Sequence, residues 1–121
     1  MTKPDMRILT GVRLFNQRHW RDALLLFETV WVQTRLSEHK ALVQIANCVL
    51  QLHLGLYKSP RVLIPKALAL LTAEPSCTGI DIPMLVQGLR QLATIIPADD
   101  EHQLGVSEIP DIRIWWKYGD S

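Results

Sequence analysis

The stretch that decides the fold is residues 20–34, which read WRDALLLFETVWVQT. Their apolar side chains recur at three- and four-residue spacing, and that spacing places them on one face of an α-helix. The face consists of Trp20, Ala23, Leu24, Phe27, Val30 and Trp31. The pattern therefore predicts an amphipathic helix that buries this face against a neighbouring element.

The segment before this helix, residues 5–16, repeats the same periodicity. Its apolar face consists of Ile8, Leu9, Val12 and Phe15. Only three polar residues, 17–19, separate the two segments, and a connection this short makes consecutive helices antiparallel neighbours. We therefore expect a helical hairpin over residues 8–34. The side chains expected to be buried in it are Phe15, Leu24, Phe27 and Trp31.

Three further helices are expected downstream. The first begins at Ser37, whose hydroxyl would cap its amino terminus, and closes at Ser59-Pro60. The second runs to about Thr72 and either starts or kinks at Pro65, because proline lacks an amide hydrogen and clashes with the preceding turn. The third follows Asp81, a good amino-terminal cap, and continues to about Ile96. The apolar face of the first of these helices consists of Ala41, Leu42, Ile45, Ala46, Val49, Leu52 and Leu56, and that of the last of Leu85, Leu89 and Leu92.

The carboxy-terminal residues, 97–121, lack helical spacing. Ile112-Arg113-Ile114 alternates like a short strand, so an extended conformation is expected. The predicted fold is therefore all-α: a five-helix bundle of antiparallel hairpins over residues 1–96, with an extended tail over residues 97–121. The tail's apolar side chains would pack on the chain's own helices or on a second copy, with disorder as the alternative. The candidates for this interaction are Ile112, Ile114, Trp115 and Trp116.

Composition narrows the classes of function. About half of the 121 residues are apolar, and 13 Lys and Arg against 12 Asp and Glu leave a net charge of +1. This balance disfavours nucleic acid as a partner, because such binding needs a basic surface. Signal-peptide and membrane-spanning patterns are not seen, and two unpaired cysteines suit a reducing cytoplasm. We therefore expect a cytoplasmic protein that binds neither nucleic acid nor a membrane.

Polar residues on the predicted helices suggest where a pocket would form. Glu28 stands between apolar residues, and burying a carboxylate is costly unless it is paired. It would meet polar side chains of the next helix, or it would lie in water at the rim of the apolar face. Trp31 shares its side of the helix. The candidates for a pocket are Glu28, Trp31, Gln44, Gln51 and His53.

Several short motifs resemble the domain-of-unknown-function family 309. The likeness covers about residues 8–92. The first matching segments are Phe15-Asn16, Trp20-Arg21-Asp22-Ala23 and Glu28-Thr29-Val30-Trp31. The later ones are Gln44-Ile45-Ala46, Gly55, Lys66-Ala67-Leu68 and Gly79-Ile80-Asp81. The resemblance implies a helical fold.

The family's motif is His-Glu-x-x-Glu-x-x-Trp, and it has prompted the suggestion of metal-dependent hydrolysis. Here Leu24 and Leu25 stand at the positions of the first His and Glu, and only Glu28 and Trp31 of the motif remain. One carboxylate without imidazole and acid partners does not hold a catalytic metal. We therefore expect no metal and no cofactor.

Two functional interpretations follow. Missing acid–base pairs, apolar helix faces and a tryptophan-rich tail favour a non-catalytic module that binds a protein partner or itself, as a homodimer for example. The alternative is a small-molecule hydrolase or binding protein with a pocket around Glu28. A buried Glu28 in a cleft would favour the second interpretation, and an exposed apolar patch would favour the first.

Overall fold

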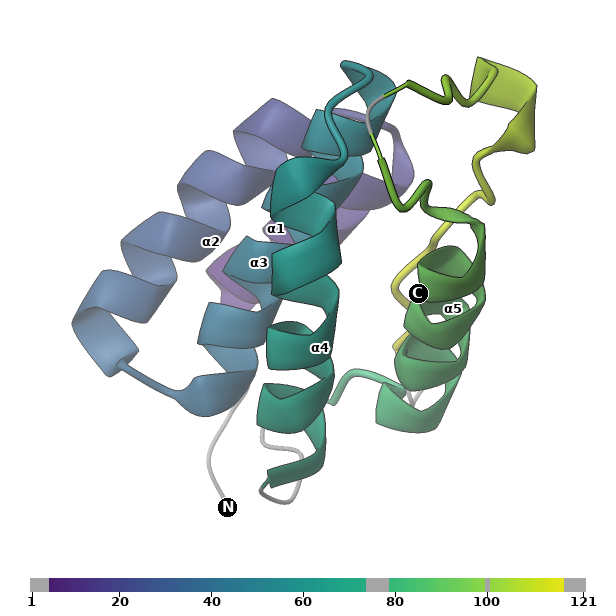
Figure 1. Cartoon of the computed structure of the whole chain (residues 1–121). Helices are drawn as coiled ribbons and strands as arrows, with labels where there is room; N and C mark the ends of the chain where they lie inside the picture. The colour runs from purple at the N-terminus through teal and green to yellow at the C-terminus, as the bar shows by residue number, and fades with distance from the viewer. Residues whose placement is uncertain (1–4, 74–78, 100, 117–121) are drawn as a thin grey trace.

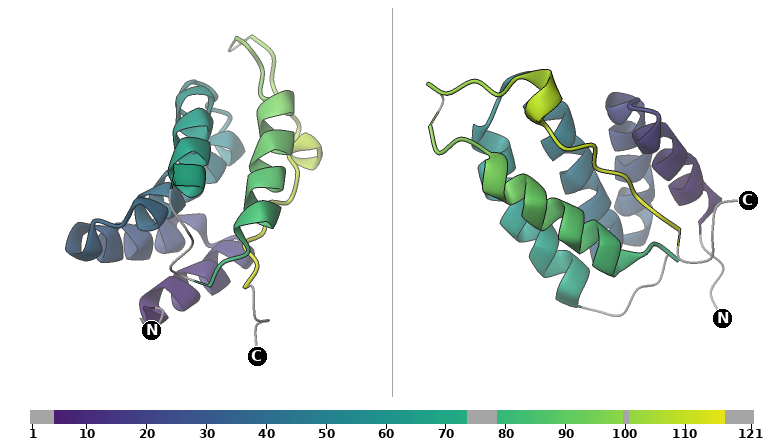
Figure 2. Two further views of the ribbon diagram at one scale, coloured as in Figure 1. Left: turned by 90° about the horizontal axis from the view of Figure 1, so that it is seen from below. Right: turned by 90° about the vertical axis from the view of Figure 1, so that its right-hand side faces the viewer.

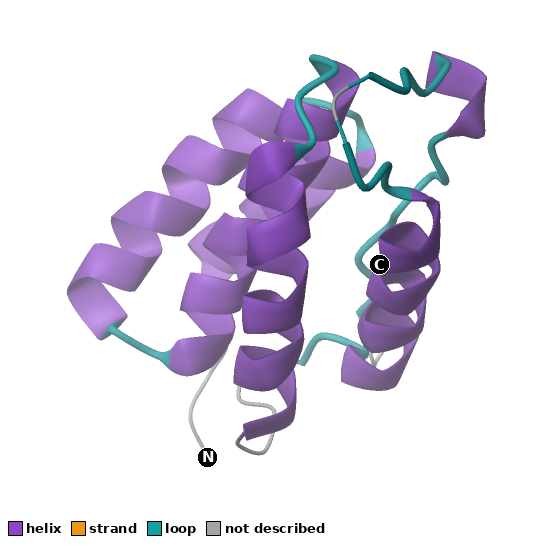
Figure 3. Cartoon of the chain, in the orientation of Figure 1, coloured by secondary structure: helices purple, strands orange, loops and turns teal. Residues whose placement is uncertain are grey.

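The computed structural model describes residues 5–73, 79–99 and 101–116. Within these ranges it contains five α-helices, one short 3₁₀-helix and an isolated antiparallel bridge between Ile80 and Trp116, and no β-strand. The helices are α1 (Met6–Asn16), α2 (Trp20–Thr34), α3 (Ser37–His53), α4 (Lys58–Ala73) and α5 (Ile82–Ile95), and η1 (Val106–Glu108) is the 3₁₀-helix. The predicted all-α fold is confirmed (Figures 1 and 3).

The α1–α2 hairpin is confirmed. Phe15 and Phe27 are fully buried between its helices. The buried residues of α3 belong to the same core. Gly11 permits a close approach, because a Cβ atom at this position would lie 2.5 Å from Cε1 of Phe27. The expectation that Leu24 and Trp31 are buried is only partly right, since both are half-exposed at the edge of the buried face.

Helix α3 lies between α2 and α4 and contributes the largest share of the core (Figure 1). Two details of its prediction were wrong. Leu36, in an extended conformation, occupies the cap position, and Ser37 is the first helical residue. Leu56 is exposed because the helix ends at His53 and Gly55 turns the chain away with a φ of 76°.

Helix α4 also begins differently from the prediction. Pro60 lies in its first turn, where the missing amide hydrogen costs nothing, so Ser59-Pro60 opens α4 instead of closing α3. Pro65 lies inside α4, so this helix does not start there. Pro65 is exposed, whereas Ile64 before it and Ala67 after it are buried.

Helix α5 begins as predicted, with the Asp81 carboxylate accepting a hydrogen bond of 3.2 Å from the Met84 amide. Leu85, Leu89 and Leu92 are buried against the rest of the core. The final described segment, residues 109–116, runs extended beside α5 toward α1 (Figure 2). The extended tail is therefore confirmed over these residues, and positions 117–121 lie outside the described part of the chain.

Candidate functional site

The carboxy-terminal segment is held by a side-chain clamp from α1. The Asn16 Nδ2 donates to the Ile114 carbonyl, and the Ile114 amide donates to Asn16 Oδ1, both at 2.9 Å. A single amide thus satisfies the donor and the acceptor of one residue, as a neighbouring strand would. Ile112 and Ile114 are buried, so the apolar side of this segment belongs to the same core as the helices.

The other two predicted interaction residues differ from each other. Trp116 is half-buried and packs against the core, and its bridge to Ile80 fixes the segment near the start of α5. Trp115 is exposed, and the guanidinium of Arg113 lies 5.3 Å from its ring centroid. In the described segment, three of the four predicted residues therefore pack on the chain's own helices, and Trp115 remains accessible.

A second anchor holds the segment that follows α5. The buried Tyr57 hydroxyl accepts a hydrogen bond of 2.7 Å from the Leu104 amide. Arg61 donates to the Pro97 carbonyl at 2.8 Å. These contacts and the Asn16 clamp attach residues 97–116 to α1 and to the start of α4.

The predicted pocket residues do not converge in the structure. Glu28 is exposed on α2 and has no ion pair with another described residue. The His53 ring stacks on Trp20 at 4.1 Å, and its Nδ1 lies 3.0 Å from the Val49 carbonyl oxygen. Gln51 bonds only to Asn47, in its own helix, at 3.4 Å. These contacts are local, and none of them joins Glu28 to a side chain of α3.

Gln44 is the exception among the pocket candidates. Its Oε1 is buried and has no hydrogen-bond partner among the described residues. A buried amide oxygen without a partner is costly, although the amide is otherwise half-exposed and can turn. This atom belongs to α3, and Glu28 of α2 is not its partner.

The outward surface of α2 carries two exposed aliphatic side chains. Leu25 is 57% exposed, Val32 56% and Leu36, two residues past the helix end, 41%. Leu25 and Val32 are seven residues apart, so they lie on one face, and that face is opposite the buried residues Ala23, Phe27 and Val30. We call Leu25, Thr29 and Val32 the α2 outer face.

Charged residues flank the α2 outer face on one side. The Arg35 guanidinium lies 4.5 Å from the centroid of the Trp31 ring, and Nζ of Lys40 lies 5.7 Å from it. Glu28 precedes Trp31 by three residues and therefore shares its side of the helix. The Trp31 ring therefore lies close to the cationic groups of Arg35 and Lys40 and on the same side of the helix as Glu28. Of the residues predicted to form a pocket, only Glu28 and Trp31 lie at this edge of α2, whereas Gln44, Gln51 and His53 lie on α3.

A buried polar group lies where α2 meets α3. His39 is buried and its Nδ1 is 2.7 Å from Thr34 Oγ1, and Glu38 beside it is also buried. Burial lowers the pKa of His39 below its ordinary value, while Glu38 and Asp5 act in the opposite direction and Arg7 adds to the lowering. Sequence reasoning missed His39 because nothing in its neighbourhood distinguishes it from an exposed helix residue.

Two other titratable groups are perturbed by their partners. The Arg7 guanidinium, 2.8 Å from Asp5, lowers the pKa of that carboxyl to about 2. Burial raises the pKa of the Cys48 thiol to about 12, which makes it an inert core side chain. Among the described residues no group of three His, Cys, Asp or Glu side chains is placed to hold a metal ion. None of the described helices is long and apolar enough to cross a membrane.

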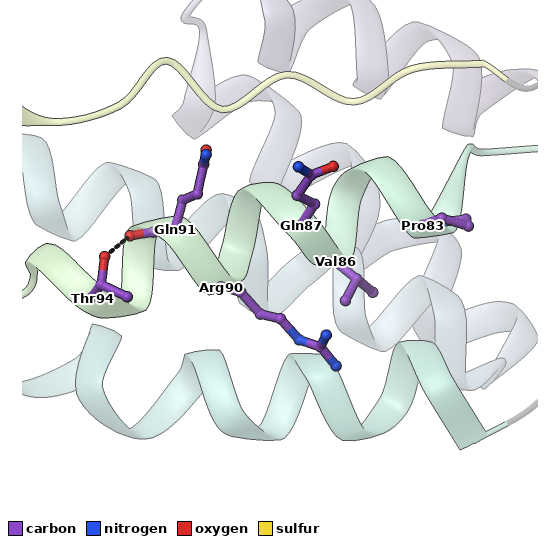
Figure 4. A pocket seen from close by; sticks show the side chains of 6 residues that line it. All are labelled: Pro83, Val86, Gln87, Arg90, Gln91 and Thr94. Carbon is purple, nitrogen blue, oxygen red and sulfur yellow. Dashed lines mark hydrogen bonds between the residues drawn. The ribbon is translucent and has the colours of Figure 1, made fainter.

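Three surface clefts lie around α5. The first, of about 370 Å³, is lined by α5 residues alone (Figure 4). There Arg90 points toward α4, whereas Gln87 and Gln91 point toward the carboxy-terminal segment, so the polar groups diverge. A second cleft, of about 290 Å³, lies between Pro60 and Pro97 where α4 meets the end of α5.

The third cleft, of about 310 Å³, lies between α5 and the carboxy-terminal segment. Gln87, Gln91, Asp111, Arg113 and Trp115 contribute to its walls. Arg113 is already stacked on Trp115, so its guanidinium faces a ring instead of the open cleft. None of the three clefts is lined by a pocket candidate predicted from the sequence.

Comparisons with family models, with curated proteins and with solved structures find no match for this chain. The resemblance to family 309 therefore stays a prediction. At the positions that correspond to the motif, Leu24 is half-buried, and Leu25 and Glu28 are exposed. The Trp31 ring contacts the guanidinium of Arg35.

Proposed function

We propose that this protein is a non-catalytic interaction domain whose binding surface is the α2 outer face. The observation that carries the proposal is the exposure of Leu25 and Val32 on the side of α2 opposite its core face. A helix at the surface of a globular protein normally turns polar residues outward, so neighbouring aliphatic side chains on the outward side mark a candidate contact surface. The proposed partner covers Leu25 and Val32 on this side of the helix.

The occupant that fits this surface is a helix with its own apolar stripe. The spacing of Leu25, Thr29 and Val32 alternates between four and three residues, which is the spacing that packs one helix against another. The charged rim around Trp31 adds polar groups at the edge, and an apolar centre with a polar edge is the usual anatomy of a protein interface.

The alternative, a small-molecule hydrolase or binding protein with a pocket around Glu28, has less support. Glu28 is exposed and lines none of the three clefts. The polar residues that a reaction would need around it bond within their own helices. Leu25, at a motif position that carries an acid in family 309, supplies apolar surface here instead of a carboxylate.

Site-specific photo-crosslinking in the native cell tests the proposal. A photoreactive residue at position 25 should give a covalent adduct with another protein chain, whereas the same residue at position 62 should not. Val62 is a matched control, because it is an exposed aliphatic residue, 51% accessible, on the outward side of α4. Equal adducts at both positions, or none at position 25, would count against an interface on α2.

A further inference from the structure

We propose that the turn between α2 and α3 is an acid-sensitive latch, which His39 holds closed only while its imidazole ring is neutral. The turn follows Thr34, the last residue of α2, and His39 lies in the first turn of α3 (Figure 1). Val32 of the α2 outer face lies two residues before Thr34. The latch is independent of the partner that covers that face, because the contacts that form it lie within the chain.

The backbone of this turn has a conformation that its sequence does not favour. Arg35 has a φ of 56° and a ψ of 22°, in the left-handed region that residues with a side chain rarely adopt. The Arg35 amide donates to the Trp31 carbonyl at 2.7 Å, and the Lys40 amide donates to the Leu36 carbonyl at 3.1 Å. Such a conformation persists only where the surrounding contacts fix it. Losing a side-chain contact across the turn should therefore open it.

The side-chain contact across the turn joins Thr34 to His39. Nδ1 of His39 lies 2.7 Å from Thr34 Oγ1, and the same oxygen accepts a hydrogen bond of 3.4 Å from the Leu36 amide. Thr29, in the same helix, donates its hydroxyl hydrogen to the Leu25 carbonyl at 2.9 Å, but within the described residues Thr34 makes no bond of this kind. The Thr34 hydroxyl therefore donates to Nδ1, and only a neutral ring with its hydrogen on Nε2 accepts a bond there.

Protonation of His39 would put a second hydrogen between Nδ1 and Thr34 Oγ1 and a positive charge at a buried position. The residue is only 3% exposed, and burial disfavours the charged ring. The acids Glu38, beside it on α3, and Asp5, before α1, favour the charged ring, whereas Arg7 opposes it. Asp5 is itself paired with Arg7 at 2.8 Å, so the two largely offset each other at the imidazole.

The two other cations of the turn lie against an aromatic ring. The Arg35 guanidinium is 4.5 Å and Lys40 Nζ 5.7 Å from the centroid of the Trp31 ring. A charged imidazole is therefore better solvated outside the core than in its place beside Thr34. When the pH falls below about 6.5, the ordinary pKa of histidine, the proton binds mainly to the open form, and the turn opens more often.

Hydrogen exchange measured amide by amide tests the latch. The protection factors of the Arg35, Leu36 and Lys40 amides, which correct for the pH dependence of intrinsic exchange, report how often the turn opens. Between pH 6.5 and 5.5 they should fall about three- to fivefold, as one proton bound mainly by the open form requires. The Leu85 amide, bonded to the Asp81 carbonyl at 3.1 Å in the first turn of α5, is the control and should keep its protection.

Three variants separate the imidazole from the bond that it accepts. His39→Gln does not titrate, so the protection of the turn should stay constant over this pH range. Thr34→Val keeps the shape of the side chain without its hydroxyl, and at pH 7.5 it should lower the protection about two- to tenfold, the value of one hydrogen bond. Its protection should also depend less on pH, because the neutral ring no longer accepts a bond. Thr34→Ser keeps the hydroxyl and should restore the pH dependence.

Three results would overturn the latch. One is a wild-type turn whose protection stays constant between pH 6.5 and 5.5. Another is an equal fall at Leu85, which would mean that acid loosens the whole fold. The third is a fall that persists unchanged in His39→Gln, which would assign the proton to another group. If circular dichroism shows that His39→Gln does not fold, the two Thr34 variants decide, since equal pH dependence in Thr34→Val and Thr34→Ser would also contradict the latch.

Discussion

The Asn16 clamp makes a prediction whose magnitude can be worked out from the structure. Asn16→Ala removes both hydrogen bonds to the backbone of Ile114. Ile114 is only 1% exposed. Water does not reach this residue while the segment is docked, so its amide and carbonyl lose their partners. Each unsatisfied backbone group costs about 1–3 kcal/mol.

Undocking sets an upper limit on that cost. If the segment leaves the helices, Ile114 regains water, but the buried side chains of Ile112 and Ile114 are then exposed at about 1.5–3 kcal/mol each. The molecule takes the cheaper route, so we expect the free energy of unfolding to fall by about 2–4 kcal/mol. Chemical denaturation measures it, with Gln17→Ala, the exposed neighbour in sequence, as the control.

Two further measurements identify the mechanism. Trypsin cleavage after the exposed Arg113 should become faster in Asn16→Ala, because the segment opens more often. Asn16→Asp keeps the acceptor for the Ile114 amide, but its ionised form cannot donate to the carbonyl. Its folded-state pKa is therefore raised, and its deficit in stability should shrink as the pH falls through that pKa. A loss below about 0.5 kcal/mol in Asn16→Ala, with unchanged cleavage, would refute the clamp.

Four other changes test the core and its titratable groups. Phe27→Ala should lower the free energy of unfolding by about 3–5 kcal/mol in chemical denaturation, since the ring is fully buried; a loss under 1 kcal/mol, typical of surface sites, would contradict this. Gly11→Ala should destabilise by about 1–3 kcal/mol despite the higher helix propensity of alanine, because its methyl group would meet the Phe27 ring at 2.5 Å; a melting temperature above wild type would contradict it. Because the pKa of His39 is lowered in the folded state, the unfolded chain binds a proton more readily. The free energy of unfolding should therefore fall as the pH decreases below about 6.5, and in His39→Gln it should fall less over the same pH range. In a Cys77→Ser background, Cys48 should react with a thiol reagent only at the rate of unfolding, and fast labelling of folded protein would show that it is accessible.

The sequence predicts the helices well where one strong pattern controls them. The bounds of α2 follow from its apolar face, and the start of α5 follows from Asp81, because both signals lie within a single helix. The start of α3 at Ser37 was predicted correctly, but its cap was not. Serine at a helix start is a good cap, whereas the tight connection after Arg35, with its φ of 56°, leaves Leu36 as the cap residue. That geometry depends on how α2 and α3 pack.

The contacts that complete the structure could not be predicted in the same way. Asn16 bonds to a residue 98 positions later, and an asparagine at the end of a helix looks like an ordinary terminus. Tyr57 likewise bonds to residues beyond α5. Local patterns indicate that a tail is apolar and extended, but the side chain that receives it is determined only by the three-dimensional arrangement of the helices.

The same reasoning explains why Glu28 was assigned to a pocket. An acid among leucines suggests burial when the helix is expected to have a single apolar face. In the structure Glu28 lies on the exposed side of α2, away from the buried face that contains Phe27 and Val30. An acid in that position does not need a buried partner, because water solvates it. The residue that suggested a pocket is therefore explained by its position on the helix: Glu28 is a solvated acid that lies between Trp31 and the exposed side chains of Leu25 and Val32.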